Sequence, residues 1–240
     1  MAVLERNYNL SQRMTQALGR AIVCGKYNIN DSLPSEAVLC SDFGVSRTAV
    51  REAVKMLSAK GLISSRQRQG IRILPEEEWN ILDPDLLRWS LESNPSLLVL
   101  KEFLQMRIAI EPEAAALAAS NANPERIAVV RDALERMDRA RGKNAEDALE
   151  ADIDFHISIL YASENRFFIR MRDFTRTALN VSIRHTNRIR SNLKGVVADH
   201  GRVLSAIENH DPDKARQYML ELIEEALSFI ENEVEKQNQS

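Results

Sequence analysis

Asp152 and His156 have side chains that could take part in chemistry. They lie four positions apart in the apolar stretch EADIDFHISIL. On a helix, this spacing places both side chains on one face. A further lone histidine, His200, lies in the stretch VADHGRVLSAI. Carboxylate and neutral imidazole together are ligands that suit Zn²⁺ or a similar first-row divalent ion such as Ni²⁺. Asp152, His156 and His200 are therefore candidate metal ligands.

A plain hydrogen bond is the competing interpretation of Asp152 and His156. Apolar residues are spread nearly all round the expected helix 145–163, so we expect the whole helix, and this pair with it, to be buried. Buried polar groups need hydrogen-bond partners. The two side chains satisfy that need if they bond to each other across one turn. For the pair alone this interpretation is favoured, and it is His200 that brings the metal hypothesis forward.

Two charged residues lie on an apolar stripe in the segment 95–120. The spacing of the stripe marks one inward helix face, formed by Leu97, Leu100, Leu104, Arg107, Glu111, Ala114 and Ala118. A charge on such a face is costly unless it is paired. Either Arg107 pairs with Glu111 one turn later, or its planar guanidinium receives an anionic ligand. Arg184, in the basic stretch NVSIRHTNRIR, is a further candidate donor to such a ligand.

The elements that must position these residues are helices. From Pro95 onward the sequence shows only helical periods and no alternating strand pattern. Polar breaks separate six expected helices, at about 95–120, 124–141, 145–163, 166–191, 195–209 and 211–236. We therefore expect residues 95–240 to form an all-α bundle.

The bulk composition is that of a two-domain globular chain. It has 240 residues, 44% of them hydrophobic and 28% charged. No apolar run reaches membrane-spanning length, and the first residues contain no apolar signal core. Cys24 and Cys40 do not suggest a disulfide framework. We therefore expect a cytoplasmic protein with no membrane partner.

The first third of the chain is basic and the remainder is acidic. Residues 1–75 contain 11 lysines and arginines against 5 acidic residues, a net charge of +6, which leaves −9 for the rest of the chain. In residues 1–74, three helical periods precede two short strands around a polar tip, the plan of a winged helix-turn-helix. The acidic, proline-bearing segment 75–94 is the expected linker. The asymmetry of charge favours double-stranded DNA as the partner of the first domain.

The third helix, 47–60, is the expected recognition helix. Its first residues Arg47, Thr48 and Arg51 lie within one turn of the cap Ser46, where side chains reach base edges in the major groove. At the wing tip, four residues are candidates for contacts with phosphates or the minor groove: Arg66, Arg68, Gln69 and Gly70.

The stretch LPSEAVLCSDFGVSRTAVREAVKMLSAKGLISSRQRQG resembles the DNA-binding domain of the GntR family of bacterial transcription regulators, over about residues 10–74. The resemblance implies a homodimer on a short palindromic operator. The wing departs from the family pattern, because Arg68, Gln69 and Gly70 stand where Gly-x-Gly is frequent.

Residues 96–236 resemble the FCD ligand-binding domain of the FadR subfamily, through ADIDFHISIL and DHGRVLSAIENHDPDKARQYM. Many members hold a metal with one Asp and three His, and a small carboxylate effector completes the shell. Asp152, His156 and His200 match the first three ligand positions, whereas Leu222 replaces the fourth histidine. The replacement implies weaker metal binding, or an effector held by the same polar residues directly. The segment EEEWNILDPDLLRWSLE resembles that of members that answer to sugar acids.

The sequence thus predicts a mainly α protein: a winged helix-turn-helix followed by an FCD-type helical bundle, acting as a dimeric, ligand-responsive repressor of an operon for the breakdown of sugar acids or other organic acids. A metal-responsive regulator is the alternative. A metal-dependent hydrolase or lyase is disfavoured, because the chain has no nucleophile motif and an enzyme would leave the DNA-binding module unexplained.

Overall fold

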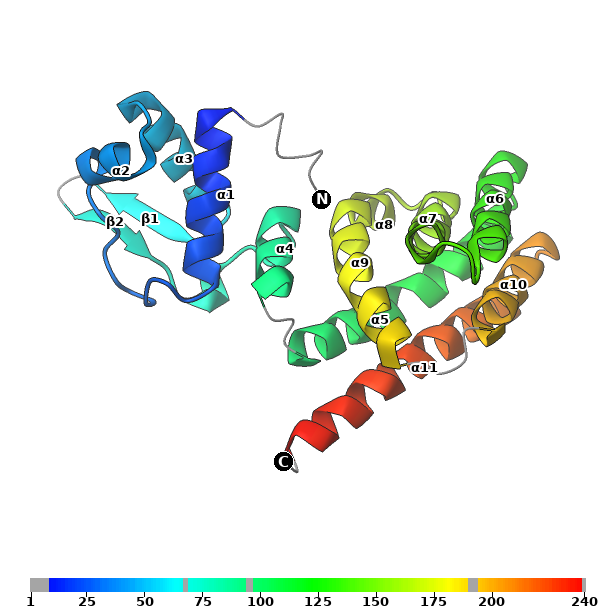
Figure 1. Ribbon diagram of the computed structural model, residues 1–240. Helices are drawn as coiled ribbons and strands as arrows, with labels where there is room; N and C mark the ends of the chain where they lie inside the picture. Colours follow the sequence, from blue (N-terminus) through cyan, green and yellow to red (C-terminus); the bar gives the residue numbers. More distant parts are fainter. Residues whose placement is uncertain (1–8, 67–68, 94–96, 190–193, 239–240) are drawn as a thin grey trace. The chain divides into compact units, whose positions relative to one another are not determined.

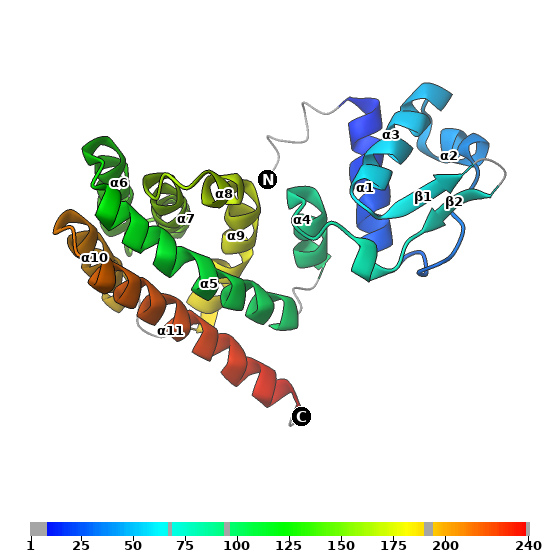
Figure 2. The same ribbon diagram turned by 180° about the vertical axis from the view of Figure 1, so that it is seen from behind.

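The computed structural model describes residues 9–66, 69–93, 97–189 and 194–238. The chain divides into two compact units, residues 1–94 and 95–240, each drawn in Figures 1 and 2. Within the described ranges, no helix is both long and apolar enough to cross a membrane.

The first unit has the expected winged helix-turn-helix plan. Its elements are α1 (Leu10–Val23), α2 (Glu36–Phe43), α3 (Arg47–Ala59) and the antiparallel strands β1 (Ile63–Arg66) and β2 (Gly70–Ile73). Side-chain oxygens of Asn9, Ser35 and Ser46 cap the three helices by accepting backbone N–H groups. Gly44 ends α2 in the left-handed conformation (φ 62°), which glycine adopts without steric cost. The chain can therefore turn directly into α3.

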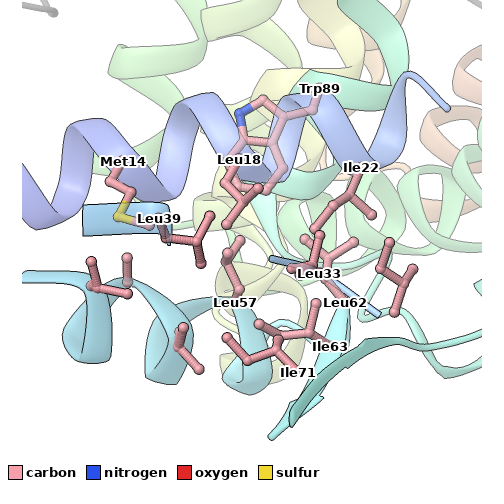
Figure 3. Close-up of a cluster of buried hydrophobic side chains, with 14 of the residues drawn as sticks. Met14, Leu18, Ile22, Leu33, Leu39, Leu57, Leu62, Ile63, Ile71 and Trp89 are labelled. Carbon is pink, nitrogen blue, oxygen red and sulfur yellow. The ribbon is translucent and has the colours of Figure 1, made fainter. Parts of the chain in front are cut away.

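A single apolar cluster holds this unit together. Figure 3 shows Met14, Leu18 and Ile22 of α1 facing Leu57 of α3. The strands contribute Ile63, Ile71 and Ile73, because alternate strand residues point to the same face. Met14, Leu18 and Ile22 recur every four positions, so burial of this apolar stripe fixes the rotation of the helix.

The segment 75–94, expected as a linker, belongs to the first unit. It contains the short 3-10 helix η2 (Glu76–Glu78) and α4 (Pro84–Ser93), and α4 packs against α1. Trp89 is fully buried, and its indole N–H donates to Gln16 Oε1 at 2.9 Å. Its ring needs a neighbour without a side chain, and Gly19 supplies one.

The second unit consists of helices only, in the described residues. They are α5 (Leu97–Asn121), α6 (Pro124–Ala140), α7 (Ala145–Ala162), α8 (Arg166–Arg170), α9 (Arg172–Ile189), α10 (Lys194–Glu208) and α11 (Pro212–Asn238). The single helix expected at 166–191 is two helices, with a break at Met171. No proline or glycine marks this break, so local sequence gave no sign of it.

Helices α5 and α11 run antiparallel and side by side, as Figures 1 and 2 show. Ion pairs at both ends fix the direction: Lys101 with Glu231 at 2.9 Å, and Arg216 with Glu113 at 3.0 Å. Helix α7 packs against α5, α6 and α9, which explains why it is apolar nearly all round. A polar side chain on the inner faces of α5 or α7 therefore has no access to bulk water.

Candidate functional site

Five polar side chains meet in the interior of the second unit. Arg107 and Glu111 come from α5, Asp152 and His156 from α7, and His200 from α10. Each is buried, with between 2% and 8% of its surface exposed. Three helices must therefore be correctly packed before this cluster exists.

Glu111 lies at the centre of one half of the cluster. Its Oε1 accepts from Nε of Arg107 at 2.6 Å and its Oε2 accepts from a terminal nitrogen of Arg107 at 3.0 Å. The same Oε2 lies 2.8 Å from Nδ1 of His156. Burial by itself would raise the pKa of Glu111, but the charges and hydrogen bonds of Arg107 and His156 outweigh it and lower the pKa to about 2. Glu111 is therefore an anion that joins α5 to α7.

Asp152 lies at the centre of the other half. Its Oδ1 is 3.2 Å from Nε2 of His200 and 3.4 Å from Nε2 of His156. Against the effect of burial, the charge of His200 and the hydrogen bonds from both rings hold the pKa of Asp152 well below its ordinary value. Burial and the charge of Arg107 lower the pKa of His156, but the charge of Glu111 together with the hydrogen bonds to Asp152 and Glu111 outweighs them and leaves the pKa raised. Both imidazoles thus point Nε2 at one carboxylate oxygen.

The hydrogen-bond partners of the ring nitrogens indicate whether a metal fits between these side chains. Nδ1 of His200 is 2.7 Å from the carbonyl oxygen of Val196, and Nδ1 of His156 faces the Glu111 carboxylate. Both oxygens only accept, so a proton on Nδ1 satisfies each of them and, in a neutral ring, leaves the lone pair on Nε2. A terminal nitrogen of Arg107 also lies 3.1 Å from Nδ1 of His156. Two lone pairs then face the anionic oxygen of Asp152, an arrangement that needs a proton or a cation between the atoms.

The spacing of these atoms also suits a divalent cation. Ligand atoms of Asp152, His156 and His200 all lie within 4.8 Å of one another. Two ligands of a tetrahedral zinc ion stand about 3.4 Å apart, since each is about 2.1 Å from the metal. A terminal nitrogen of Arg107, 3.2 Å from Nε2 of His156, competes for the same lone pair. The donor set fits Zn²⁺ or Ni²⁺, with Arg107 as a rival for one ligand.

Each charged pair had two predicted roles, pairing within the protein or binding of a metal or ligand, and in the structure the side chains pair with one another. Arg107 pairs with Glu111 on its own helix, and it also lies beside His156. His156 does approach Asp152, but its shorter contact is with Glu111. The link between Glu111 and His156 was missed. The signal for it is the second charge on the inward stripe of α5, because a buried carboxylate can accept from more than one donor.

Two other predicted residues lie outside this cluster. Arg184 is on the exposed face of α9, where it donates to Glu146 at 2.5 Å and to Asn180 at 3.1 Å. The structure therefore does not bring Arg184 to the buried residues, because the apolar face of α9 is turned inward instead. Leu222 is buried in α11.

The first residues of α3 form a separate, exposed site. Arg47, Thr48 and Arg51 are all exposed, and Arg47 and Arg51 are one turn apart on the same face. Nε of Arg51 donates to Oε2 of Glu36, the first residue of α2, at 3.1 Å. This contact lies across the helix-turn-helix and engages one edge of the guanidinium.

The wing supplies further exposed polar groups. Arg66 and Gly70 form the last pair of the β1–β2 ladder, and Gly70 has a positive φ of 76° that suits the turn. Gln69 is exposed beside them. Arg68 lies outside the described residues.

Comparisons with known proteins find a family match in each of the two units. Residues 10–73 match the family model of bacterial regulatory proteins of the gntR family, and residues 102–225 match that of the FCD domain. Among curated proteins, the HTH-type transcriptional regulator YieP of Escherichia coli K12 is 36% identical over 210 residues, covering 86% of this chain and 89% of that protein. The galactonate operon transcriptional repressor of the same organism is 31% identical over 217 residues, covering 90% and 94%.

The fold is shared with solved structures as well. Lar, which controls expression of the Listeria monocytogenes agr system, has a TM-score of 0.62 at 19% identity, covering 94% of this chain and 98% of that one. A GntR protein of Streptococcus agalactiae has a TM-score of 0.50 at 20% identity, covering 91% and 99%. The curated relatives named above are transcription regulators, not enzymes.

Proposed function

Because this chain belongs to the GntR family of bacterial transcription regulators and carries an FCD domain, we propose that it is a dimeric repressor whose affinity for DNA changes when a small sugar acid binds. It acts in the cytoplasm on an operon for the breakdown of carbohydrate acids or other organic acids. The observation that carries this proposal is the buried convergence of Arg107, Asp152, His156 and His200 in a chain that also presents Arg47 and Arg51 on an exposed helix.

The DNA-reading role rests on the chemistry of α3. The two terminal nitrogens of an arginine match O6 and N7 of guanine, and Arg51 keeps that edge available while Glu36 takes Nε. One helix of this size reads only a few base pairs, so a homodimer on a palindromic operator is needed for selectivity. Arg66, Gln69 and Gly70 of the wing are proposed to contact the backbone.

The effector role rests on the charge of the buried cluster. Arg107 contributes +1, while Glu111 and Asp152 contribute −1 each, so with neutral imidazoles the site carries −1. A divalent cation together with one monocarboxylate brings this sum to zero. A sugar acid, with one carboxylate and several hydroxyls, suits the donors of Arg107 and the acceptors around it. Two relatives support this class of effector: the galactonate operon repressor and a Uxu operon regulator from Haemophilus influenzae, 26% identical.

Asp152, His156 and His200 are the residues proposed to hold a metal, Zn²⁺ or Ni²⁺, with position 222 unable to contribute. A bound divalent ion would supply a cationic contact for the effector carboxylate. Glu111 and the Val196 carbonyl hold the Nδ1 protons and so orient both rings. The effector changes DNA binding only if it favours one arrangement of the protein over another.

The test is a DNA-binding assay on a site that the protein itself selects from a random-sequence library. Sugar acids are added with and without Zn²⁺. We expect a selected palindrome whose occupancy changes when a sugar acid is present, and a ligand at one hundred times its dissociation constant to stabilise the protein by about 2.7 kcal/mol. No selected site, or no acid that changes both stability and occupancy, would reject the proposal.

A metal-responsive regulator is the second candidate, and the observation that favours it is that Nε2 of His156 and Nε2 of His200 both face one oxygen of Asp152. In that case Zn²⁺ or Ni²⁺ alone changes operator occupancy, with no organic acid present. The metal-only arm of the same assay separates the two candidates.

A further inference from the structure

We propose that Glu111 is the positioning residue of the buried site: it orients the His156 ring toward Asp152 and fixes the plane of the Arg107 guanidinium. This inference rests on the proposed effector site, and it concerns a residue that neither metal nor effector needs to touch.

Both carboxylate oxygens of Glu111 are engaged by Arg107 and His156. Its side chain is 2% exposed, one oxygen accepts from Nε of Arg107, and the other accepts from both Arg107 and His156. Among the described residues, no buried side-chain nitrogen or oxygen lacks a partner. A ligand entering the cluster would therefore find the arginine and the imidazole already held by one carboxylate.

The position of the proton on the His156 ring depends on the acceptor that Glu111 provides. With Glu111 as acceptor, a neutral ring keeps its proton on Nδ1 and its lone pair on Nε2, 3.4 Å from Oδ1 of Asp152. Without that acceptor, the proton gains more on Nε2, where it can donate to Asp152, and the lone pair is turned away from the site. Outer partners of this kind change metal affinity by about tenfold to a hundredfold.

Glu111 also orients Arg107. Its two parallel hydrogen bonds to Glu111, at 2.6 Å and 3.0 Å, fix the plane of the guanidinium. A buried arginine held in one plane loses little further freedom when it binds a planar carboxylate. Glu111 thus orients both the His156 ring and the Arg107 guanidinium before a ligand binds.

A competing role for Glu111 is simple neutralisation of the buried charge of Arg107. That role predicts lower stability after substitution but no change in the protonation pattern of His156. Variants that remove Arg107 separate the two roles, because they leave no buried guanidinium to neutralise.

The experiment compares three full-length variants: Arg107→Met, Arg107→Met/Glu111→Met and Arg107→Met/Glu111→Gln. The first keeps the carboxylate acceptor, the second has none, and the third regains a carbonyl acceptor without charge. Zn²⁺ alone is titrated calorimetrically into each protein. We expect Glu111→Met to weaken Zn²⁺ binding at least tenfold relative to Arg107→Met alone, and Glu111→Gln to restore most of the loss.

The second readout is the long-range ¹H–¹⁵N spectrum of the His156 ring in metal-free protein, above the pKa of that ring. We expect the Nδ1–H form in Arg107→Met and in the Gln variant, and the Nε2–H form in the Met double variant. The same form in all three proteins overturns the inference. If the unsubstituted protein binds no Zn²⁺, the metal part of the proposed function fails, and the spectra alone decide the role of Glu111.

Discussion

The six-membered ring of Trp89 occupies the space that a side chain at position 19 would need. A Cβ atom built on Gly19 would lie 2.4 Å from two carbons of this ring, closer than real Cβ contacts. Trp89 comes from α4 and Gly19 from α1, so a missing side chain in one helix fixes the position of the other. Because α4 is the last element of the first unit, this contact ties residues 84–93 to the winged helix-turn-helix.

We expect Gly19→Ala to destabilise the first unit by about 1–3 kcal/mol, because overpacking outweighs the better helix propensity of alanine. Gly201→Ala is the matched control. Its Cβ would meet nothing closer than 3.9 Å, so it should be neutral or stabilise by up to about 1 kcal/mol. Urea unfolding measures both: Trp fluorescence follows the first unit, which contains both tryptophans, and far-ultraviolet circular dichroism follows the helical second unit. Equal effects at positions 19 and 201 would show that the Trp89 contact does not constrain α4.

The ion cluster of Lys60 with Asp83 and Asp85 should make the packing of α4 against the winged helix-turn-helix sensitive to acid. Lys60 lies 2.8 Å from Asp83 and 2.9 Å from Asp85. Burial raises the pKa of Asp85, but the hydrogen bonds from Lys60 and Gln16 outweigh it, so the pKa falls below its ordinary 3.8. A carboxyl with a lowered folded pKa contributes fully above its unfolded pKa and loses that contribution as the pH falls through its folded pKa. The window is therefore below pH 3.8.

We expect Asp85→Asn to lower the urea midpoint by a constant amount from about pH 8 down to about pH 4, and by less at lower pH. Asp132→Asn, at an exposed pair in the second unit, is the control and should show a smaller difference throughout. A gap between Asp85→Asn and the unsubstituted protein that stays constant below pH 3.8 contradicts this prediction.

Arg51→Ala should remove base discrimination from the DNA-binding surface. One bidentate arginine–guanine contact contributes about 1–3 kcal/mol, so we expect affinity for the selected site to fall about tenfold to a hundredfold. The fold should survive, because the side chain is 67% exposed. A gel shift at moderate salt measures the loss.

Lys55→Ala is the matched control, since it removes the same charge one turn further along α3. It should weaken binding to all sequences alike and reduce the salt dependence by about one phosphate contact at most. If both variants lose the same affinity on every sequence, Arg51 does not read a base.

Arg107→Met should abolish stabilisation by a sugar acid while leaving Zn²⁺ binding in place. It should also destabilise the second unit by about 3 kcal/mol, because Glu111 then lacks one buried partner. Arg107→Met/Glu111→Met should recover much of that stability, since both buried charges are gone. Thermal-shift and urea measurements follow the two effects, and an undiminished sugar-acid shift in Arg107→Met removes this residue from the effector site.

Leu222→His should tighten Zn²⁺ binding about tenfold or more, if position 222 faces the three existing ligands. The neighbouring Leu220→His gives a histidine on a different face of α11 and should leave the affinity unchanged. Calorimetric titration of Zn²⁺ into both proteins makes the comparison. Equal affinities for the two variants would place position 222 away from the site.

The sequence by itself determined the parts whose signals are local. Caps at Ser35 and Ser46, the glycine after α2, and the helical periods from Pro95 onward each act within a few residues, so they predicted the winged helix-turn-helix and the all-α bundle. Spacing of four residues likewise placed Asp152 and His156 on one face of α7.

Only the tertiary structure decided how distant residues meet. Glu111 reaches His156 because α5 packs against α7 with those two faces opposed, and Trp89 settles over Gly19 because α4 turns back onto α1. Arg184 is exposed because the apolar stripe of α9 takes the inward face. Such contacts depend on the rotation of each helix about its axis, which is set by burial across the whole unit and not by any short stretch of sequence.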